Sequence, residues 1–139
     1  MRPVLRDEFV TIVATDHPAA RRGMNLRTFL SLRHILVSPE GERHGLVDQA
    51  LAQQGKKRIL ALTLPQMFAA PAVVARTNMT ATVMKRVALS SPVGRRLVLF
   101  PPPIVLPEIV FDLIWHRRSE SNPAQQWFRA LIESTGAML

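Results

Sequence analysis

Cysteine is absent from this chain of 139 residues. Disulfide bonds, thiolate nucleophiles and cysteine-ligated zinc are therefore excluded. The first ten residues, MRPVLRDEFV, hold no apolar stretch of signal-peptide length before their charges, so we expect no export. Both features are compatible with a cytoplasmic protein, and the cytoplasm is the location that we expect.

Long uninterrupted hydrophobic runs are also missing. A membrane-spanning helix needs about 20 mostly apolar residues. The two most apolar windows are residues 59–75 and 97–115. Pro65 and Pro71 interrupt the first, and the second contains four prolines and two carboxylates. We therefore expect no membrane partner.

The composition favours a folded domain. Hydrophobic residues make up 47% of the chain and charged residues 20%, a balance that disordered chains do not have. The length suits one domain that can bury a real core.

The formal net charge of +8 admits two interpretations. One is a basic nucleic-acid-binding protein, which salt-dependent binding to random DNA would support. The other is solvated charge with a mild bias toward acidic partners. We favour the second, because the basic residues form short clusters at element boundaries and no helix carries a basic stripe. These clusters are Arg21-Arg22, Lys56-Lys57-Arg58, Lys85-Arg86, Arg95-Arg96 and Arg117-Arg118.

Short strand and helix patterns alternate along the chain, which predicts an α/β fold with a parallel or mixed sheet covered by helices. The last helix is predicted to begin at the cap Asn122 and to end at Thr135-Gly136. Its inner face would carry Trp127, Ala130 and Leu131. The predicted strands are residues 9–14, 34–37, 59–62, 79–83, 97–100 and 109–115, and the shorter helices lie near residues 26–30, 46–51, 69–75 and 84–89.

The stretch RILALTLPQMFAAPAVVA, residues 58–75, organises the rest. Its apolar run at residues 59–62 is typical of a strand buried on both faces. Pro65 suits the first turn of a following helix, where its missing N–H has no intrahelical partner to lose. In α/β sheets, ligands bind outside the carboxyl ends of strands, beside helix N-termini. We therefore expect a ligand site at this turn.

The order and spacing of six motifs resemble the effector-binding domain of LysR-type transcriptional regulators. Each motif is weak alone, but together they extend over more than a hundred residues. Met84 stands where that family usually has proline. The motifs are DHPAA (16–20), LRTFLSLRHILVSPEG (26–41), GLVDQALAQQGKKRILALTLPQMFAAPAVVA (45–75), MTATVMKRVA (79–88), LVLFPPPIVLPEIVFDLIWHRR (97–118) and NPAQQWFRALI (122–132).

The resemblance implies a type 2 periplasmic-binding-protein-like fold. The chain would hold the complete second lobe, residues 9–107, and the C-terminal part of the first, residues 1–8 and 108–139. The helix-turn-helix and the first half of lobe one would lie outside it, so DNA would be bound only through that absent helix-turn-helix. The tail would then show exposed apolar surface or self-associate, and a homo-oligomer is expected.

In the family, a small effector binds between the lobes. The resemblance implies that, in this chain, the residues that contact the effector lie at the ends of three strands. Hydroxyls, an amide and free N–H groups can hold a carboxylate, so we expect an anionic effector. The alternative is that Thr63 is a cap, Gln66 a solvated residue and Met67 core. The implied effector-binding residues are Ser38, Thr63, Pro65, Gln66, Met67 and Thr82.

Catalytic and metal sites are not indicated. The four histidines, His17, His34, His44 and His116, show no two-histidine helical spacing beside an acid. Ser38, His44 and Asp48 lack the Gly-x-Ser-x-Gly turn of a serine nucleophile. We therefore expect no enzyme activity, no cofactor and no metal, and a role in transcription regulation through effector sensing. A solute-binding protein lobe of the same fold is the alternative.

Overall fold

The computed structural model describes residues 1–139 and divides the chain into two compact units. The larger unit is Glu8–Pro107. The smaller unit combines Met1–Asp7 with Glu108–Leu139. None of the helices is both long enough and apolar enough to cross a membrane.

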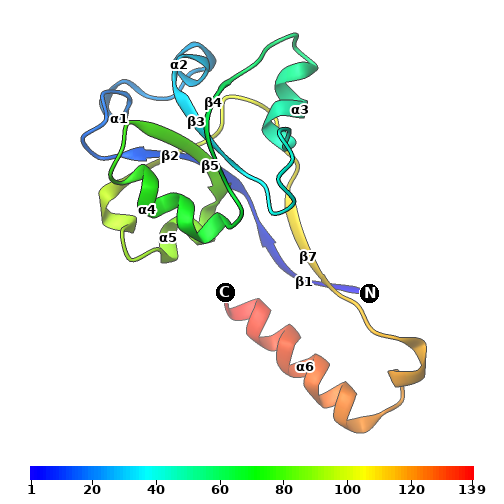
Figure 1. The fold of residues 1–139 in the computed structure, drawn as a ribbon. Coiled ribbons are helices and arrows are strands. Elements are labelled where there is room, and N and C mark those ends of the chain that lie inside the picture. The colour runs from blue at the N-terminus through cyan, green and yellow to red at the C-terminus, as the bar shows by residue number, and fades with distance from the viewer. The chain divides into compact units, whose positions relative to one another are not determined.

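A five-stranded mixed sheet forms the larger unit, which confirms the prediction of an α/β fold. Its strand order is β4-β3-β5-β2-β6. β3 runs parallel to β4 and β5, whereas β2 runs antiparallel to β5 and β6. The carboxyl ends of β4, β3 and β5 therefore lie side by side at one edge (Figure 1). The strands are β2 (Phe9–Ala14), β3 (Arg33–Val37), β4 (Ile59–Leu64), β5 (Met79–Met84) and β6 (Leu97–Phe100).

Short helices cover both faces of this sheet (Figure 1). Residues of α4 and α5 pack on one face, and residues of α2 and α3 form a second core cluster on the other. Because each face has its own covering helices, both faces can bury side chains. The helices are α1 (Ala19–Arg22), α2 (Leu26–Ser31), α3 (Leu46–Ala52), α4 (Ala70–Val74) and α5 (Lys85–Ser90), with 3-10 turns η1 (Met67–Ala69) and η2 (Gly94–Arg96).

The prediction that residues 59–62 are buried on both faces is wrong. β4 is the edge strand of the sheet, and it pairs only with β3. Ile59 is 52% exposed and Leu60 39% exposed. An apolar run shows that a strand exists, but its position in the sheet depends on pairing with distant segments.

Pro65 does not start a helix, contrary to the sequence-based prediction. It lies in a bend after β4, and Gln66 has extended backbone angles, φ −128° and ψ 130°. The chain turns through η1 before α4 begins at Ala70. Pro71, in the first turn of α4, holds the position that we assigned to Pro65.

The smaller unit contains a two-stranded antiparallel ribbon and the longest helix. Asn122 accepts a hydrogen bond from the Gln125 N–H, which confirms it as the cap of α6. The predicted end of the helix at Thr135-Gly136 is wrong, because α6 continues to Met138. Gly136 instead allows a close approach to β1, since a Cβ at this position would clash with the Val4 carbonyl. The elements are β1 (Arg2–Asp7), β7 (Ile109–Leu113), η3 (Arg117–Ser119) and α6 (Pro123–Met138).

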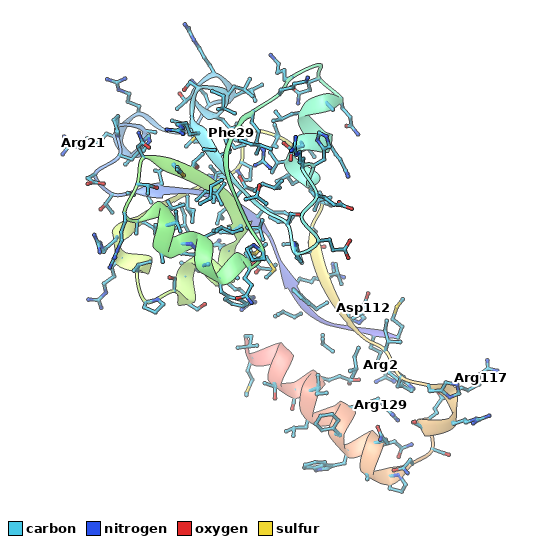
Figure 2. All side chains as sticks on the ribbon, in the orientation of Figure 1. Arg2, Arg21, Phe29, Asp112, Arg117 and Arg129 are labelled. Atoms are coloured by element: carbon cyan, nitrogen blue, oxygen red, sulfur yellow. The ribbon has the colours of Figure 1, made fainter.

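The inner face predicted for the last helix is also wrong. Arg129 is the buried residue of α6, whereas Trp127 is 67% exposed and Leu131 is exposed as well. The Arg129 guanidinium lies 4.8 Å from the centre of the Trp115 ring. Arg129 and Arg2, which are both labelled in Figure 2, also line one pocket. Two strands cannot cover all the apolar groups of this unit, so the exposed apolar surface expected on the tail is present.

Candidate ligand-binding site at the strand ends

β3 and β5 separate at their carboxyl ends. The two strands pair only as far as Ile35 and Ala81. Beyond that point, the rest of β3 pairs with β4, while Thr82 to Met84 pair with β2. The carboxyl ends of β3 and β5 therefore leave a wedge-shaped gap between them, while β3 stays paired with β4 and β5 with β2. The candidate site occupies this wedge.

A pocket of about 240 Å³ opens at the wedge. Its wall is mostly apolar, and its polar groups are few. It is smaller than the roughly 300–1,000 Å³ that is usual for drug-sized ligands, so it suits a small molecule. The lining residues are Phe9, Ile35, Leu36, Val37, Gly45, Leu46, Val47, Arg58, Met67, Thr82 and Leu106.

Two of the residues predicted for the site, Met67 and Thr82, line this pocket. Met67 follows β4, and its sulfur accepts the Met84 N–H at 3.4 Å, which links the turn after β4 to the end of β5. Thr82 projects from β5, and its hydroxyl lies 3.0 Å from the hydroxyl of Thr11 on β2. The two segments therefore hold one another at the pocket wall.

The other predicted residues lie at the same strand ends but outside the pocket lining. Ser38 is buried, and its N–H donates to the Leu64 carbonyl at 2.8 Å, which ties the end of β3 to the end of β4. Thr63, Pro65 and Gln66 are exposed. Gln66 makes no side-chain hydrogen bond at the start of η1. The role of these residues in binding a ligand stays a prediction.

Sequence reasoning did not assign the other lining residues to the site, among them Phe9, Arg58 and Leu106. Phe9 begins β2 and lies opposite Met84 in the register, so only the antiparallel pairing brings it to the site. Leu106 belongs to the proline-rich segment after β6, which packs on the α2 and α3 cluster. Neither contact follows from local pattern. Arg58 was considered only as part of a basic cluster.

Arg58 is held by a buried bidentate ion pair. Its Nε and Nη2 donate to the two carboxylate oxygens of Asp48, each at 2.8 Å, and the Arg58 side chain is 3% exposed. The Gly45 N–H also donates to Asp48, which fixes the first turn of α3. Burial acts to raise the pKa of Asp48, but the hydrogen bonds from Arg58 and Gly45 outweigh it and hold that pKa below its usual value. The charge of Arg58 is therefore already balanced.

His34 lies on β3, is fully buried and does not line the pocket. Its Nε2 lies 2.6 Å from the Phe29 carbonyl, which can only accept, so Nε2 carries the proton and the lone pair of Nδ1 has no partner. The Phe29 and His34 rings meet edge to face at 4.4 Å. Burial lowers the pKa of His34 to about 4. The ring is therefore neutral and serves as a packing element of the second core.

The family profile described as the LysR substrate binding domain matches residues 1–137. The chain is similar to the transcriptional activator NagR of a Ralstonia species, with 34% identity over 131 residues. It is equally similar to the activator NahR of Pseudomonas putida, with 34% identity over 133 residues. Each match covers 94% of this chain and 44% of the relative. The chain thus spans less than half the length of these curated relatives.

Solved structures of transcriptional regulators resemble this chain as well. A probable transcriptional regulator from Pseudomonas aeruginosa superposes with a TM-score of 0.81 and 27% identity over 96% of this chain and 44% of that one. The effector-binding domain of QuiR, solved in complex with shikimate, has a TM-score of 0.64 at 14% identity and covers 99% of this chain and 65% of that one, so it supports the fold alone. The chain therefore belongs to the LysR substrate binding domain family, the effector-binding regulatory domain of LysR-type transcriptional regulators, which is not a family of enzymes.

Proposed function

We propose that this chain senses a small effector for a LysR-type transcriptional regulator, and that the pocket between the carboxyl ends of β3 and β5 holds part of that effector. The single observation that carries the proposal is this pocket, because it lies where parallel strands end, which is where α/β proteins bind ligands. Its apolar wall with few polar groups is typical of small-molecule sites.

The exposed residues beside the pocket extend the proposed site. Thr63, Gln66 and the buried Ser38 lie at the ends of β4 and β3, next to Met67. Pro65 shapes the turn that presents Gln66. A carboxylate on the effector would be met by hydroxyl, amide and backbone N–H groups here, and the net charge of +8 favours such an anion.

The lobe organisation belongs to the same proposal. Residues 9–107 correspond to a complete second lobe, and residues 1–8 with 108–139 to the C-terminal part of lobe one. The exposed apolar groups of β7 and α6 support this, since the remainder of lobe one, which is outside this chain, would cover them. A ligand that binds one arrangement of the lobes better than another shifts the protein toward that arrangement. DNA contact through a helix-turn-helix, a homo-oligomer and a cytoplasmic location complete the proposal.

Backbone amide NMR of the chain, titrated with a panel of small carboxylates, amines and alcohols, tests the site. We expect shift changes to cluster at Val37, Met67 and Thr82 for at least one compound. Shift changes concentrated away from the strand ends for every compound that binds, or no binding across the panel, would contradict the proposal.

A substitution separates binding from stability. Gln66→Ala is expected to weaken binding of that compound and to leave the melting temperature nearly unchanged, because Gln66 is exposed and its side chain makes no hydrogen bond. Gln54→Ala is the matched control, since Gln54 is an exposed glutamine at the far end of α3. A large drop in melting temperature for Gln66→Ala would make the residue structural.

A further inference from the structure

A second pocket, of about 620 Å³, lies beside α3 and is lined by residues from the loop before this helix, the turn after it and the start of β4. It is larger than the pocket between β3 and β5, and its volume is within the roughly 300–1,000 Å³ that is usual for small-molecule sites. Its lining is mostly apolar and includes Ala52 and Leu60. None of the residues predicted to bind the effector lines it, so the effector proposal does not account for this pocket.

Positive charge is concentrated around this second pocket. Arg43, Lys56 and Lys57 line it, are exposed and take part in no ion pair. We call these three side chains the rim cations. Asp48 is the one acid among the lining residues, and Arg58 already binds both of its carboxylate oxygens. The rim cations therefore have no carboxylate partner in the pocket, and their field favours an anion with more than one charge.

Arg58 gives the pocket a fixed hydrogen-bond donor. Its side chain is 3% exposed, and Asp48 holds it through Nε and Nη2. A guanidinium group has five N–H donors, and Asp48 takes two of them, while Nη1 makes no hydrogen bond in the structure. Because the ion pair fixes the guanidinium plane, an oxyanion would meet donors that are already oriented. Exposed lysines alone are solvated charge, whereas a buried arginine with unused donors can anchor a ligand.

We propose that the second pocket is a binding site separate from the one between β3 and β5, and that it takes a small phosphate ester with an apolar body. The phosphate would accept hydrogen bonds from Arg58 and lie among the rim cations, while the apolar body would lie against Leu60. A phosphate monoester carries a charge of roughly −1.5 to −2 at pH 7 and three acceptor oxygens. It therefore matches several cations better than a carboxylate does, and arginine binds phosphate with directed donors.

Phenyl phosphate, inorganic phosphate and benzyl alcohol are the probes. Each is titrated into the 139-residue chain at constant ionic strength, and backbone amide NMR reports the dissociation constant and the place of binding. Phenyl phosphate should bind roughly tenfold more tightly than either of the others, because only it uses both the cations and the apolar lining. Its shift changes should cluster at Gly55, Lys57 and Leu60. Shift changes confined to Met67 and Thr82 would place it between β3 and β5 and overturn the inference.

Substitutions of the rim cations separate a site from general attraction to a basic chain. Arg43→Gln and Lys57→Gln should each weaken phenyl phosphate binding roughly threefold to fivefold, as expected for loss of one exposed cation. Neither should change the melting temperature, because both side chains are exposed. Arg95→Gln is the matched control, since Arg95 is exposed, forms no ion pair and lies outside the pocket, yet its loss changes the net charge equally.

Arg58→Lys tests the anchor. It keeps the charge beside Asp48 but loses the planar donor group, so it should weaken phenyl phosphate binding roughly tenfold. The exposed rim variants decide the question even if this buried exchange unfolds the chain. Losses from Arg95→Gln as large as those from Arg43→Gln would show attraction to net charge alone and overturn the inference. Binding of benzyl alcohol as tight as that of phenyl phosphate would also overturn it, and so would a lack of phenyl phosphate binding. The effector proposal is tested separately, by the compound panel at the strand ends.

Discussion

The two faces of the five-stranded sheet are built from different residues. The face under α4 and α5 buries Val10, Ile12, Ile35, Ala81 and Val83, which are all apolar. The face under α2 and α3 buries polar groups as well, namely Thr11, Thr80 and His34, with the ion pair of Asp48 and Arg58 beside them. The first face is held by packing, so it tolerates apolar exchange; the second depends on specific partners, because each buried polar group needs one.

The largest expected effect comes from breaking the ion pair. Asp48→Ala leaves the Arg58 charge buried without a counterion and should lower the free energy of unfolding by about 3 kcal/mol. Denaturant unfolding measures this loss. The double variant Asp48→Leu with Arg58→Met should regain most of it, since an apolar pair of similar volume avoids the buried charge. A double variant as unstable as Asp48→Ala would contradict this account.

Lowering the pH should reduce the free energy of unfolding, because His34 on the face under α2 and α3 is buried in its neutral form. The pKa of His34 is lowered by burial from 6.5 to about 4, so between these pH values the unfolded chain binds the proton and the folded chain does not. Stability is therefore complete above pH 6.5 and falls as the pH drops toward 4, by roughly 3 kcal/mol over that window. Unfolding curves at several pH values measure the slope.

His34→Leu should remove that slope between pH 6.5 and 4, whatever its effect at pH 7. The loss below pH 3.8 should persist in His34→Leu, because the lowered pKa of Asp48 makes its carboxylate contribute stability that disappears only on protonation. An unchanged slope in His34→Leu would show that another group titrates in this window.

A conservative exchange on the apolar face should cost less. Ile12→Val removes one methylene group from a fully buried side chain and should lower the free energy of unfolding by about 1 kcal/mol, equally at pH 7 and pH 5. Thermal unfolding at both pH values checks this. A pH-dependent loss would mean that the two faces are not independent.

Met84→Pro should have the smallest effect. Met84 has φ −61°, the value that proline imposes, and the residue before it is in a strand. The exchange loses the N–H to sulfur contact with Met67 but restricts the unfolded chain, so we expect a change within about 1 kcal/mol of either sign. Denaturant unfolding beside Met84→Ala separates the backbone effect from the lost side chain.

Local sequence patterns predicted most helices and strands, but not which segments pair or which side chains are buried. The strands at residues 9–14 and 97–100 were predicted with the observed bounds, and Asn122 was identified as a cap. β1 was not predicted as a strand, because it pairs with β7, more than a hundred residues away. Three local predictions were wrong: that Pro65 starts a helix, that α6 ends at Gly136 and that Trp127 lies on the buried face of α6. Of the candidate site, Met67 and Thr82 were predicted, whereas Phe9 and Leu106 reach it only through the sheet register and a late loop.

From the sequence alone came the α/β class, a strand at residues 59–62 followed by a turn, and the motif order of LysR effector-binding domains, because periodicity, turn residues and caps act over a few neighbours. Only the tertiary structure decided that β3 and β5 separate at Ile35 and Ala81, and that Thr11 lies against Thr82. Strand order and register depend on contacts between distant segments, and no local pattern encodes them.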